Sequence, residues 1–209
     1  MRVLVGCEES GTVRDAFIAR GHDAVSVDIL PSRAPGPHIQ TTILDHQLYN
    51  GTHGEWDAGI FFPDCTFLCG SGARWNAAKW RTEAQWSAVY FVRSLWALLI
   101  NGVAIENPVG RLSTLWIKPK QIIQPWQFGD PECKATCLWL RGLPKLEPTN
   151  IVPKSDRLAS VHHMPPGPNR KRDRAKTFQG IADAMAEQWG SMNTDLFALT
   201  DDAQPGAAS

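Results

Sequence analysis

Short hydrophobic runs alternate with amphipathic segments over the first half of the chain. A helical spacing of Val13, Ala16 and Phe17 follows Thr12 and closes at Gly21. A second, longer helix is predicted over residues 83–100; apolar positions occur on most of its sides, so we expect it to be largely buried. β-branched runs typical of buried parallel strands occupy residues 2–7, 23–28, 57–62 and 103–106.

The second half of the chain is less regular. Residues 121–127 and 135–140 are interpreted as later strands that form an antiparallel hairpin at the sheet edge. Residues 153–176, rich in proline, glycine and basic residues, are predicted to be a loop, and 177–190 a final helix. We therefore expect one domain over 1–190 and a disordered tail over 191–209. The fold class is α/β: a doubly wound, mostly parallel, Rossmann-like sheet with helices on both faces.

Composition narrows the class of protein. The 209 residues suit one domain, and no apolar run is long enough to span a membrane. The first ten residues, MRVLVGCEES, have a hydrophobic stretch too short for a secretory signal before charged residues begin. The five cysteines, without an export signal, are expected to be reduced thiols. These features predict a cytoplasmic location.

The formal net charge of zero conceals an uneven distribution. Residues 153–176 hold seven basic and two acidic side chains, whereas 177–209 hold five acidic and none basic. A basic segment in a neutral chain indicates contact with an anion such as a nucleic-acid backbone. A solvated loop is the alternative.

The chemically interesting residues follow predicted strands, where ligands of such sheets bind. Cys65 comes after the strand 57–62, in a turn shaped by Pro63, and Glu106 ends the next parallel strand. A thiol and an acid on neighbouring strand ends suit covalent catalysis. The loop from Gly6 to Gly11 does not match a pyrophosphate-binding pattern, and its two acids favour an amino-bearing cofactor. Asp28, at a strand end, is placed to bind ribose hydroxyls, although a turn-forming role is equally open.

Cysteine spacing and tryptophan positions indicate two further kinds of site. The spacings Cys65–Cys69 and Cys133–Cys137 admit a zinc site, but they depart from the usual C-x2-C, and we expect no metal. Among the tryptophans, Trp75 next to Arg74 is the better candidate for stacking on a base, while Trp86 and Trp96 are expected to serve as packing bulk.

The motifs occur in the order expected of cytosine-5 DNA methyltransferases. More closely, the chain resembles a compact, phage- or prophage-encoded group of DNA cytosine methyltransferases. The resemblance covers nearly the whole chain except the tail, and it is carried by GCEESGTVRDAF, SGARW, IENPVG, IIQPWQFG, KATCLWLRGLPKL, PTNIV and KTFQGIADAMAEQWG.

The resemblance implies a reaction and a set of site residues. Cys65 would match the nucleophile that adds to C6 of cytosine, and Glu106 the acid that holds and protonates N3. The methyl donor would be S-adenosylmethionine, and the target base would have to leave the DNA stack. The expected cofactor-binding residues are Gly6, Glu9, Gly11, Asp28, Asp45 and Pro63. The expected nucleic-acid contacts are Ser71, Arg74, Trp75, Asn107, Arg170, Lys171, Arg172, Arg174 and Lys176.

The chain departs from the family pattern at several points. The Pro-Pro-Cys motif is Pro63-Asp64-Cys65 here, and a carboxylate beside the thiol raises its pKa unless a cation offsets it. The glycine loop is longer, and the stretch with Lys134 and Arg141 does not match the Gln-Arg-x-Arg motif. The short chain leaves little room for a target-recognition domain, which implies weak specificity or a partner or oligomer that supplies it. A methyltransferase acting on another pyrimidine or a free nucleotide, and an inactive nucleic-acid-binding protein, remain alternatives.

Overall fold

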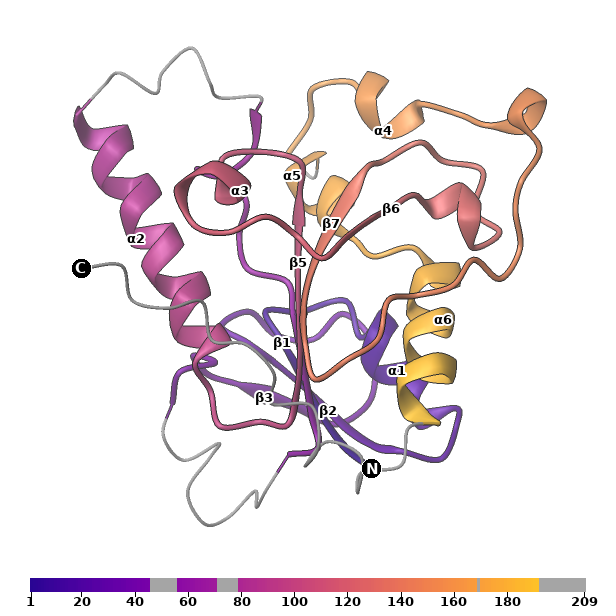
Figure 1. Ribbon diagram of the computed structural model, residues 1–209, viewed down its shortest axis with the longest axis horizontal. Helices are drawn as coiled ribbons and strands as arrows, with labels where there is room; N and C mark the ends of the chain where they lie inside the picture. Colours follow the sequence, from indigo (N-terminus) through magenta and orange to yellow (C-terminus); the bar gives the residue numbers. More distant parts are fainter. Residues whose placement is uncertain (46–55, 71–78, 169, 192–209) are drawn as a thin grey trace.

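The core of the molecule is one seven-stranded sheet (Figure 1). The computed structural model describes residues 1–45, 56–70, 79–168 and 170–191. The strands lie in the order β3-β2-β1-β4-β5-β7-β6. Their bounds are β1 Arg2–Gly6, β2 Asp23–Asp28, β3 His38–Gln40, β4 Ala58–Phe61, β5 Gly102–Pro108, β6 Gln121–Ile123 and β7 Thr136–Arg141.

Strand directions confirm the predicted fold class. β1 to β5 pair in parallel with their neighbours, whereas β7 runs antiparallel to β5 and β6 antiparallel to β7. The sheet is therefore mostly parallel, with an antiparallel β6–β7 pair at one edge, as the sequence predicted. The chain forms a Rossmann-like α/β fold.

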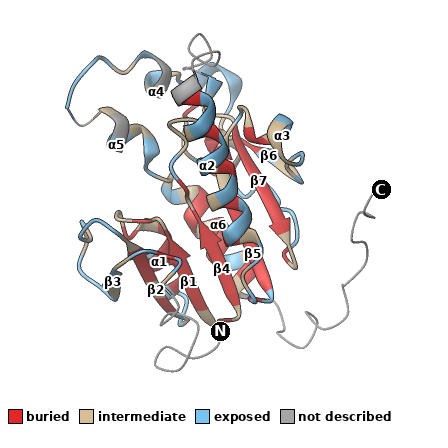
Figure 2. Cartoon of the chain, turned by 90° about the vertical axis from the view of Figure 1, so that its left-hand side faces the viewer, coloured by how far each residue is buried: buried red, intermediate tan, exposed pale blue. Residues whose placement is uncertain are grey.

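Helices cover both faces of the sheet (Figures 1 and 2). α1 (Thr12–Ile18) and α6 (Gln179–Gly190) pack side by side on one face, and α2 (Lys79–Trp96) and α3 (Leu112–Leu115) lie on the other. The sequence of β1 is almost continuously apolar because its residues pack on both faces. Val3 and Val5 join the core under α1 and α6, while Leu4 joins the core under α2. Since both faces are covered, both sets of side chains must be apolar.

The long helix differs from its prediction in position and burial. α2 spans Lys79–Trp96 rather than 83–100, and residues 97–100 form the turn that leads into β5. Only one side of it is buried, through residues such as Val89 and Val92, while Trp86 is 41% and Tyr90 60% exposed. The expectation of a largely buried helix was therefore wrong, and so was packing bulk for Trp86: its ring lies on the solvent side beside Tyr90.

The segment predicted as a loop contains short helices. η4 (Lys154–Asp156), α4 (Ser160–His163) and α5 (Arg170–Ala175) lie within 153–176. α4 begins where the buried carboxylate of Glu132 accepts hydrogen bonds from the Ser160 hydroxyl and the Val161 N–H. This partner lies 28 residues away in sequence, so local patterns could not reveal the helix.

The remaining differences are small. β6 ends at Ile123, and the rest of the strand predicted over 121–127 is the 3-10 helix η3 (Pro125–Gln127), because proline cannot donate to a strand ladder. β3 and α3 were not predicted, since each has only three or four residues.

No helix among the described residues has the length and hydropathy of a membrane span.

Candidate active site

The loop between β1 and α1 presents a buried carboxylate. Glu8 is 4% exposed, and its Oε1 accepts hydrogen bonds from the Val13 N–H (2.8 Å) and the Ser10 hydroxyl (2.9 Å). Its other oxygen, Oε2, is buried without a hydrogen-bond partner. Burial raises the pKa of Glu8, although these two donors oppose the rise. A buried acceptor without a donor is costly, and Oε2 has the capacity to accept one more N–H or O–H hydrogen bond.

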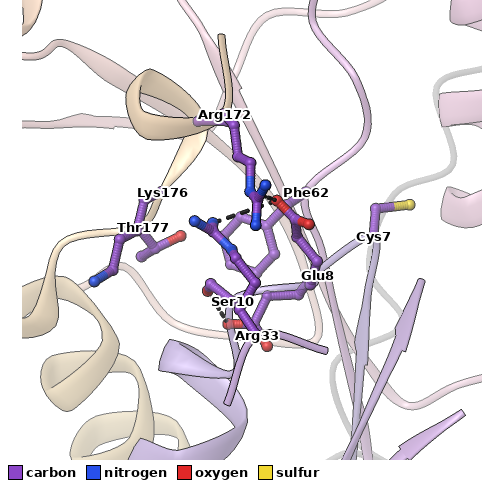
Figure 3. Close-up of a pocket in the computed structure, with 10 residues that line it drawn as sticks. Cys7, Glu8, Ser10, Arg33, Phe62, Arg172, Lys176 and Thr177 are labelled. Atoms are coloured by element: carbon purple, nitrogen blue, oxygen red, sulfur yellow. Dashed lines mark hydrogen bonds and ion pairs between the residues drawn. The ribbon is translucent and has the colours of Figure 1, made fainter. Parts of the chain in front are cut away.

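A small cavity of about 50 Å³, open to solvent, adjoins this loop (Figure 3). The loop residues 7–10 form one side, Phe62 follows β4, and Arg33 comes from the segment between β2 and β3. Arg172, Ala175 and Lys176 of the basic segment 153–176 line another side of the cavity, together with Thr177. The cavity thus combines acidic and basic side chains around one aromatic ring.

Glu9 connects the cavity walls. Its Oε1 forms ion pairs with Arg33 (3.4 Å) and with Arg172 of α5 (3.2 Å), which Figure 3 shows as dashed lines. Glu9 was predicted to bind a cofactor, but its carboxylate is paired with two arginines. Glu8, which the sequence analysis did not select, is the acid that retains an unpaired oxygen.

Space and backbone conformation explain why two positions of this loop are glycine. A Cβ at Gly6 would lie 2.6 Å from the Phe61 ring, so only glycine fits there without a shift. Gly11 precedes α1 with a left-handed φ of 76°, which favours glycine. Cys7 has a left-handed φ of 59°, rare for a side-chain-bearing residue and found at constrained sites.

Two of the predicted cofactor-binding acids, Asp28 and Asp45, lie outside the residues that line this cavity. Asp28 ends β2, where its Oδ1 accepts the Leu30 N–H (2.9 Å). It is also close enough to Cys7 to contribute, after burial, to raising the pKa of that thiol to about 12. Asp45 accepts a hydrogen bond from the Thr41 hydroxyl (3.1 Å). Asp28 therefore borders the loop after β1, as its strand-end position predicted.

A second centre lies where the parallel pairing of β4 with β5 ends, at Phe61 and Ile105, and one hydrogen bond ties its two segments together. Glu106 lies inside β5, which continues to Pro108, and not at the end of the strand as predicted. The buried Asn107 side chain donates from Nδ2 to the Pro63 carbonyl (2.9 Å) and to the Glu106 carbonyl (3.1 Å). Pro63 follows β4, and Asn107 is paired within β5. The bond therefore holds the Pro63-Asp64-Cys65 segment against the Glu106-Asn107 segment, 44 residues later in the chain.

Cys65 begins a tight turn in which the Leu68 and Cys69 N–H groups donate to its carbonyl. Burial is the first cause that raises the pKa of its thiol to about 11, followed by Cys69, Glu106 and Asp64, while Lys134 acts in the opposite direction. Asp64 is exposed, and its Oδ1 accepts both the N–H and the hydroxyl of Thr66. Its effect on the thiol is therefore smaller than that of Glu106.

Glu106 shares this environment. Burial raises the pKa of its carboxyl, and the Lys134 ammonium opposes the rise. A carboxyl with a raised pKa favours its neutral form and can donate a proton or a hydrogen bond. The structure thus brings the two predicted catalytic residues together, and burial raises the pKa of both.

Lys134 also belongs to this centre, although it was not among the predicted site residues. Its Nζ donates to the Arg174 carbonyl (2.9 Å) and lies 5.7 Å from the centre of the Phe178 ring. A single lysine between two cysteines has no diagnostic spacing, so no local signal identified it. Its position shows only once β7 is aligned beside β5.

The basic segment lies against both centres. Arg172 pairs with Glu9, Lys176 lines the cavity, and the Arg174 carbonyl accepts from Lys134. The Arg170 Nε donates to the Met164 carbonyl (2.8 Å). The predicted nucleic-acid contacts Ser71, Arg74 and Trp75, and the side chain of Lys171, lie outside the part that the structure describes.

The cysteines carry no disulfide, since all five are free thiols. Among the described residues, no three His, Cys, Asp or Glu side chains are grouped so as to hold a metal ion. No known protein-family model matches the chain, and no curated protein matches it significantly.

Proposed function

We propose that the protein is an S-adenosylmethionine-dependent DNA cytosine-5 methyltransferase that works through a covalent bond between Cys65 and C6 of the base. The observation that carries this proposal is the Asn107–Pro63 hydrogen bond, which joins the cysteine and glutamate motifs where the parallel pairing of β4 with β5 ends. The strand order supports it further, because an antiparallel β7 inserted between β5 and β6 is the arrangement of class I methyltransferases.

The site residues divide the reaction between them. The Cys65 thiolate bonds to C6, and the electron pair of the C5–C6 double bond moves to C5 while Glu106 gives a proton to N3. C5 would accept the methyl group of the donor, which would leave as S-adenosylhomocysteine. Water acting as a base would take the C5 proton, and the thiolate would leave as the C5–C6 double bond re-forms and the N3 proton returns to Glu106. Asn107 does not touch the base in this scheme; it holds the two motifs in place.

The residues around the cavity fit the proposed cofactor. S-adenosylmethionine supplies an electrophilic methyl group on a cationic sulfur. Its amino-acid end carries an ammonium and a carboxylate, and the cavity offers the unpaired Glu8 Oε2 to the first and Lys176 or Arg33 to the second. Asp28 would accept hydrogen bonds from the ribose at the end of β2. Glu8 and Lys176 are thus the residues that we assign to the amino-acid end.

DNA is the proposed substrate because the basic segment 153–176 lies beside the same site. α5 contacts the cavity through Arg172, and its Arg174 carbonyl binds Lys134 next to Cys65. Phosphates bound along this segment would bring a flipped cytosine toward Cys65. A partner chain or oligomer would supply target specificity, and the reduced thiols suit the cytoplasm of a bacterial host.

One observation favours a second candidate, a nucleic-acid-binding protein without catalytic activity. The pKa of Cys65 is about 11, so only about one thiol in several thousand is ionised near neutral pH. Such a protein would bind DNA and leave cytosine unmodified.

The deciding experiment uses a host that lacks cytosine methylation. The chain, a Cys65→Ser variant and a matched Cys69→Ser variant are expressed, and nucleosides from the host DNA are analysed for 5-methylcytosine. We expect the mark with the wild type and with Cys69→Ser but not with Cys65→Ser, and covalent trapping of the wild type on DNA with 5-fluorocytosine. Calorimetry should show that S-adenosylhomocysteine binds wild type and Cys65→Ser alike.

The outcomes separate the candidates. Methylation that persists in Cys65→Ser would refute the assigned nucleophile. Cofactor binding with methylation only of free nucleotides would move the target away from DNA. DNA binding without cofactor binding or product would favour the inactive protein.

A further inference from the structure

The surroundings of Cys65 pose an electrostatic problem. A thiolate is the form of cysteine that attacks, yet Glu106, Asp64 and a second thiol, Cys69, all disfavour negative charge on Cys65. A second negative charge close to a carboxylate needs a nearby cation to be tolerated. Lys134 is the cation that acts on both Cys65 and Glu106.

The fold explains why Lys134 reaches this place. β7 begins two residues after Lys134, and its first residues, Thr136 and Cys137, pair with Pro108 and Asn107. Two residues beyond that paired end, Gly110 forms a bridge with Cys69, in the turn that starts at Cys65. The antiparallel insertion of β7 therefore brings Lys134 to the edge of the sheet where β4 and β5 deliver Cys65 and Glu106.

The ammonium is held in place but not neutralised. Its Nζ donates to the Arg174 carbonyl, and the Phe178 ring lies 5.7 Å away. Among the described residues, no carboxylate lies within ion-pair distance of Lys134. A carbonyl and an aromatic face orient a cation without cancelling its charge, so that charge remains available to Cys65 and Glu106.

We propose that Lys134 is a positioning residue whose fixed positive charge stabilises the Cys65 thiolate among the neighbouring carboxyls. Its part in turnover rests on the proposed function, whereas its effect on the thiol does not. α5 contributes to this arrangement, because the Arg174 carbonyl accepts a hydrogen bond from the Lys134 ammonium. The proposal accounts for how a thiol with two acidic neighbours can serve as a nucleophile.

A structural role for Lys134 predicts a different result. If Lys134 only anchored α5, removing it would loosen the segment and expose Cys65. Burial is the largest cause that raises the pKa of this thiol, so exposure would make Cys65 easier to ionise. An electrostatic role predicts that Cys65 becomes harder to ionise. The two roles therefore change the reactivity of Cys65 in opposite directions.

The test measures alkylation of Cys65 in the full chain by iodoacetamide at a series of pH values. Peptide mass spectrometry separates Cys65 from the four other thiols. Lys134→Gln retains a hydrogen-bond donor without the charge, Lys134→Arg retains both, and Lys145→Gln removes a charge from an exposed lysine as the control. Far-UV circular dichroism checks that each variant is folded.

We expect Lys134→Gln to slow alkylation of Cys65 about three- to tenfold at fixed pH, the range for one charge acting through partly solvated surroundings. Lys134→Arg should react within about twofold of wild type, and Lys145→Gln should equal it. Unchanged or faster alkylation in Lys134→Gln would overturn the proposal. Slower alkylation in a protein that never methylates cytosine would refute the proposed function and leave the electrostatic role standing.

Discussion

Arg14 holds the segment between β2 and β3 from inside the protein. Its side chain is fully buried, with Nε 2.8 Å from Asp15 Oδ1. Nη1 donates to the hydroxyls of Ser26 (3.1 Å) and Ser32 (3.2 Å), and Nη2 donates to the carbonyls of Pro35 (2.8 Å) and Ala34 (3.5 Å). One guanidinium therefore fastens the chain that follows Asp28 and that carries Arg33 into the cavity.

The cost of Arg14→Met follows from what each partner can do without the arginine. Ser26 retains His38 as a hydrogen-bond partner (2.9 Å), and the carbonyls of Ala34 and Pro35 can turn to water if the segment opens. We take roughly 1 kcal/mol for the bonds of each Nη group and about 1 kcal/mol for the Asp15 pair and imperfect filling, about 3 kcal/mol in all. For a chain of 209 residues this lowers Tm by about 6–12 °C.

Urea unfolding followed by tryptophan fluorescence measures this loss. Arg14→Lys should lose about half as much stability, because an ammonium keeps the charge but not the planar fork. Arg20→Met is the matched control: Arg20 is part-exposed, and its ion pairs with Asp183 and Glu187 lie on the surface, so we expect a change below about 1 kcal/mol. If Arg14→Met costs no more than Arg20→Met, the reasoning about the buried guanidinium fails.

Two further predictions concern charge. Because burial raises the pKa of Glu106 above its ordinary 4.5, the folded protein binds this proton more tightly than the unfolded chain, and stability falls as pH rises through that raised pKa. Glu106→Gln should therefore raise the urea midpoint at pH 8 and leave it nearly unchanged at pH 4; equal destabilisation at both would contradict this. Replacing Arg170, Arg174 and Lys176 by glutamine should weaken DNA binding and lower the slope of log K against log salt by up to about 3, whereas an unchanged slope would make the segment a solvated one.

Several features of the fold were predictable because they depend on local chemistry. The strands β1, β2, β4 and β5 are rich in apolar residues because helices cover both faces of the sheet, and they lie within two residues of the predicted positions. The same regularity predicted Cys65 and Glu106 at neighbouring strand ends. Parallel order alone brings such ends to one edge of the sheet.

Other features could not be predicted, because their partners are distant in sequence. α4 depends on Glu132, 28 residues before Ser160, and α5 approaches the cavity through an ion pair with Glu9. The prediction of a loop over 153–176 was wrong for this reason. Its short helices lack an apolar period, and contacts with the rest of the domain stabilise them. Similarly, α2 has apolar residues on several sides, and only packing decides that Trp86 and Tyr90 face solvent.

The sequence by itself determined the class of fold, because the hydrophobic period is a local property of the chain. Strand-end position is local too, and it predicted Cys65 and Glu106 as the catalytic pair. The tertiary structure alone decided the distribution of charge around the cavity and around Cys65. It paired Glu9 with arginines and left Glu8 Oε2 without a partner, and it inserted β7 so that Lys134 lies beside Cys65 and Glu106. Charge acts through space over several ångströms, so its effect depends on which distant segments fold together rather than on which residues are neighbours in the chain.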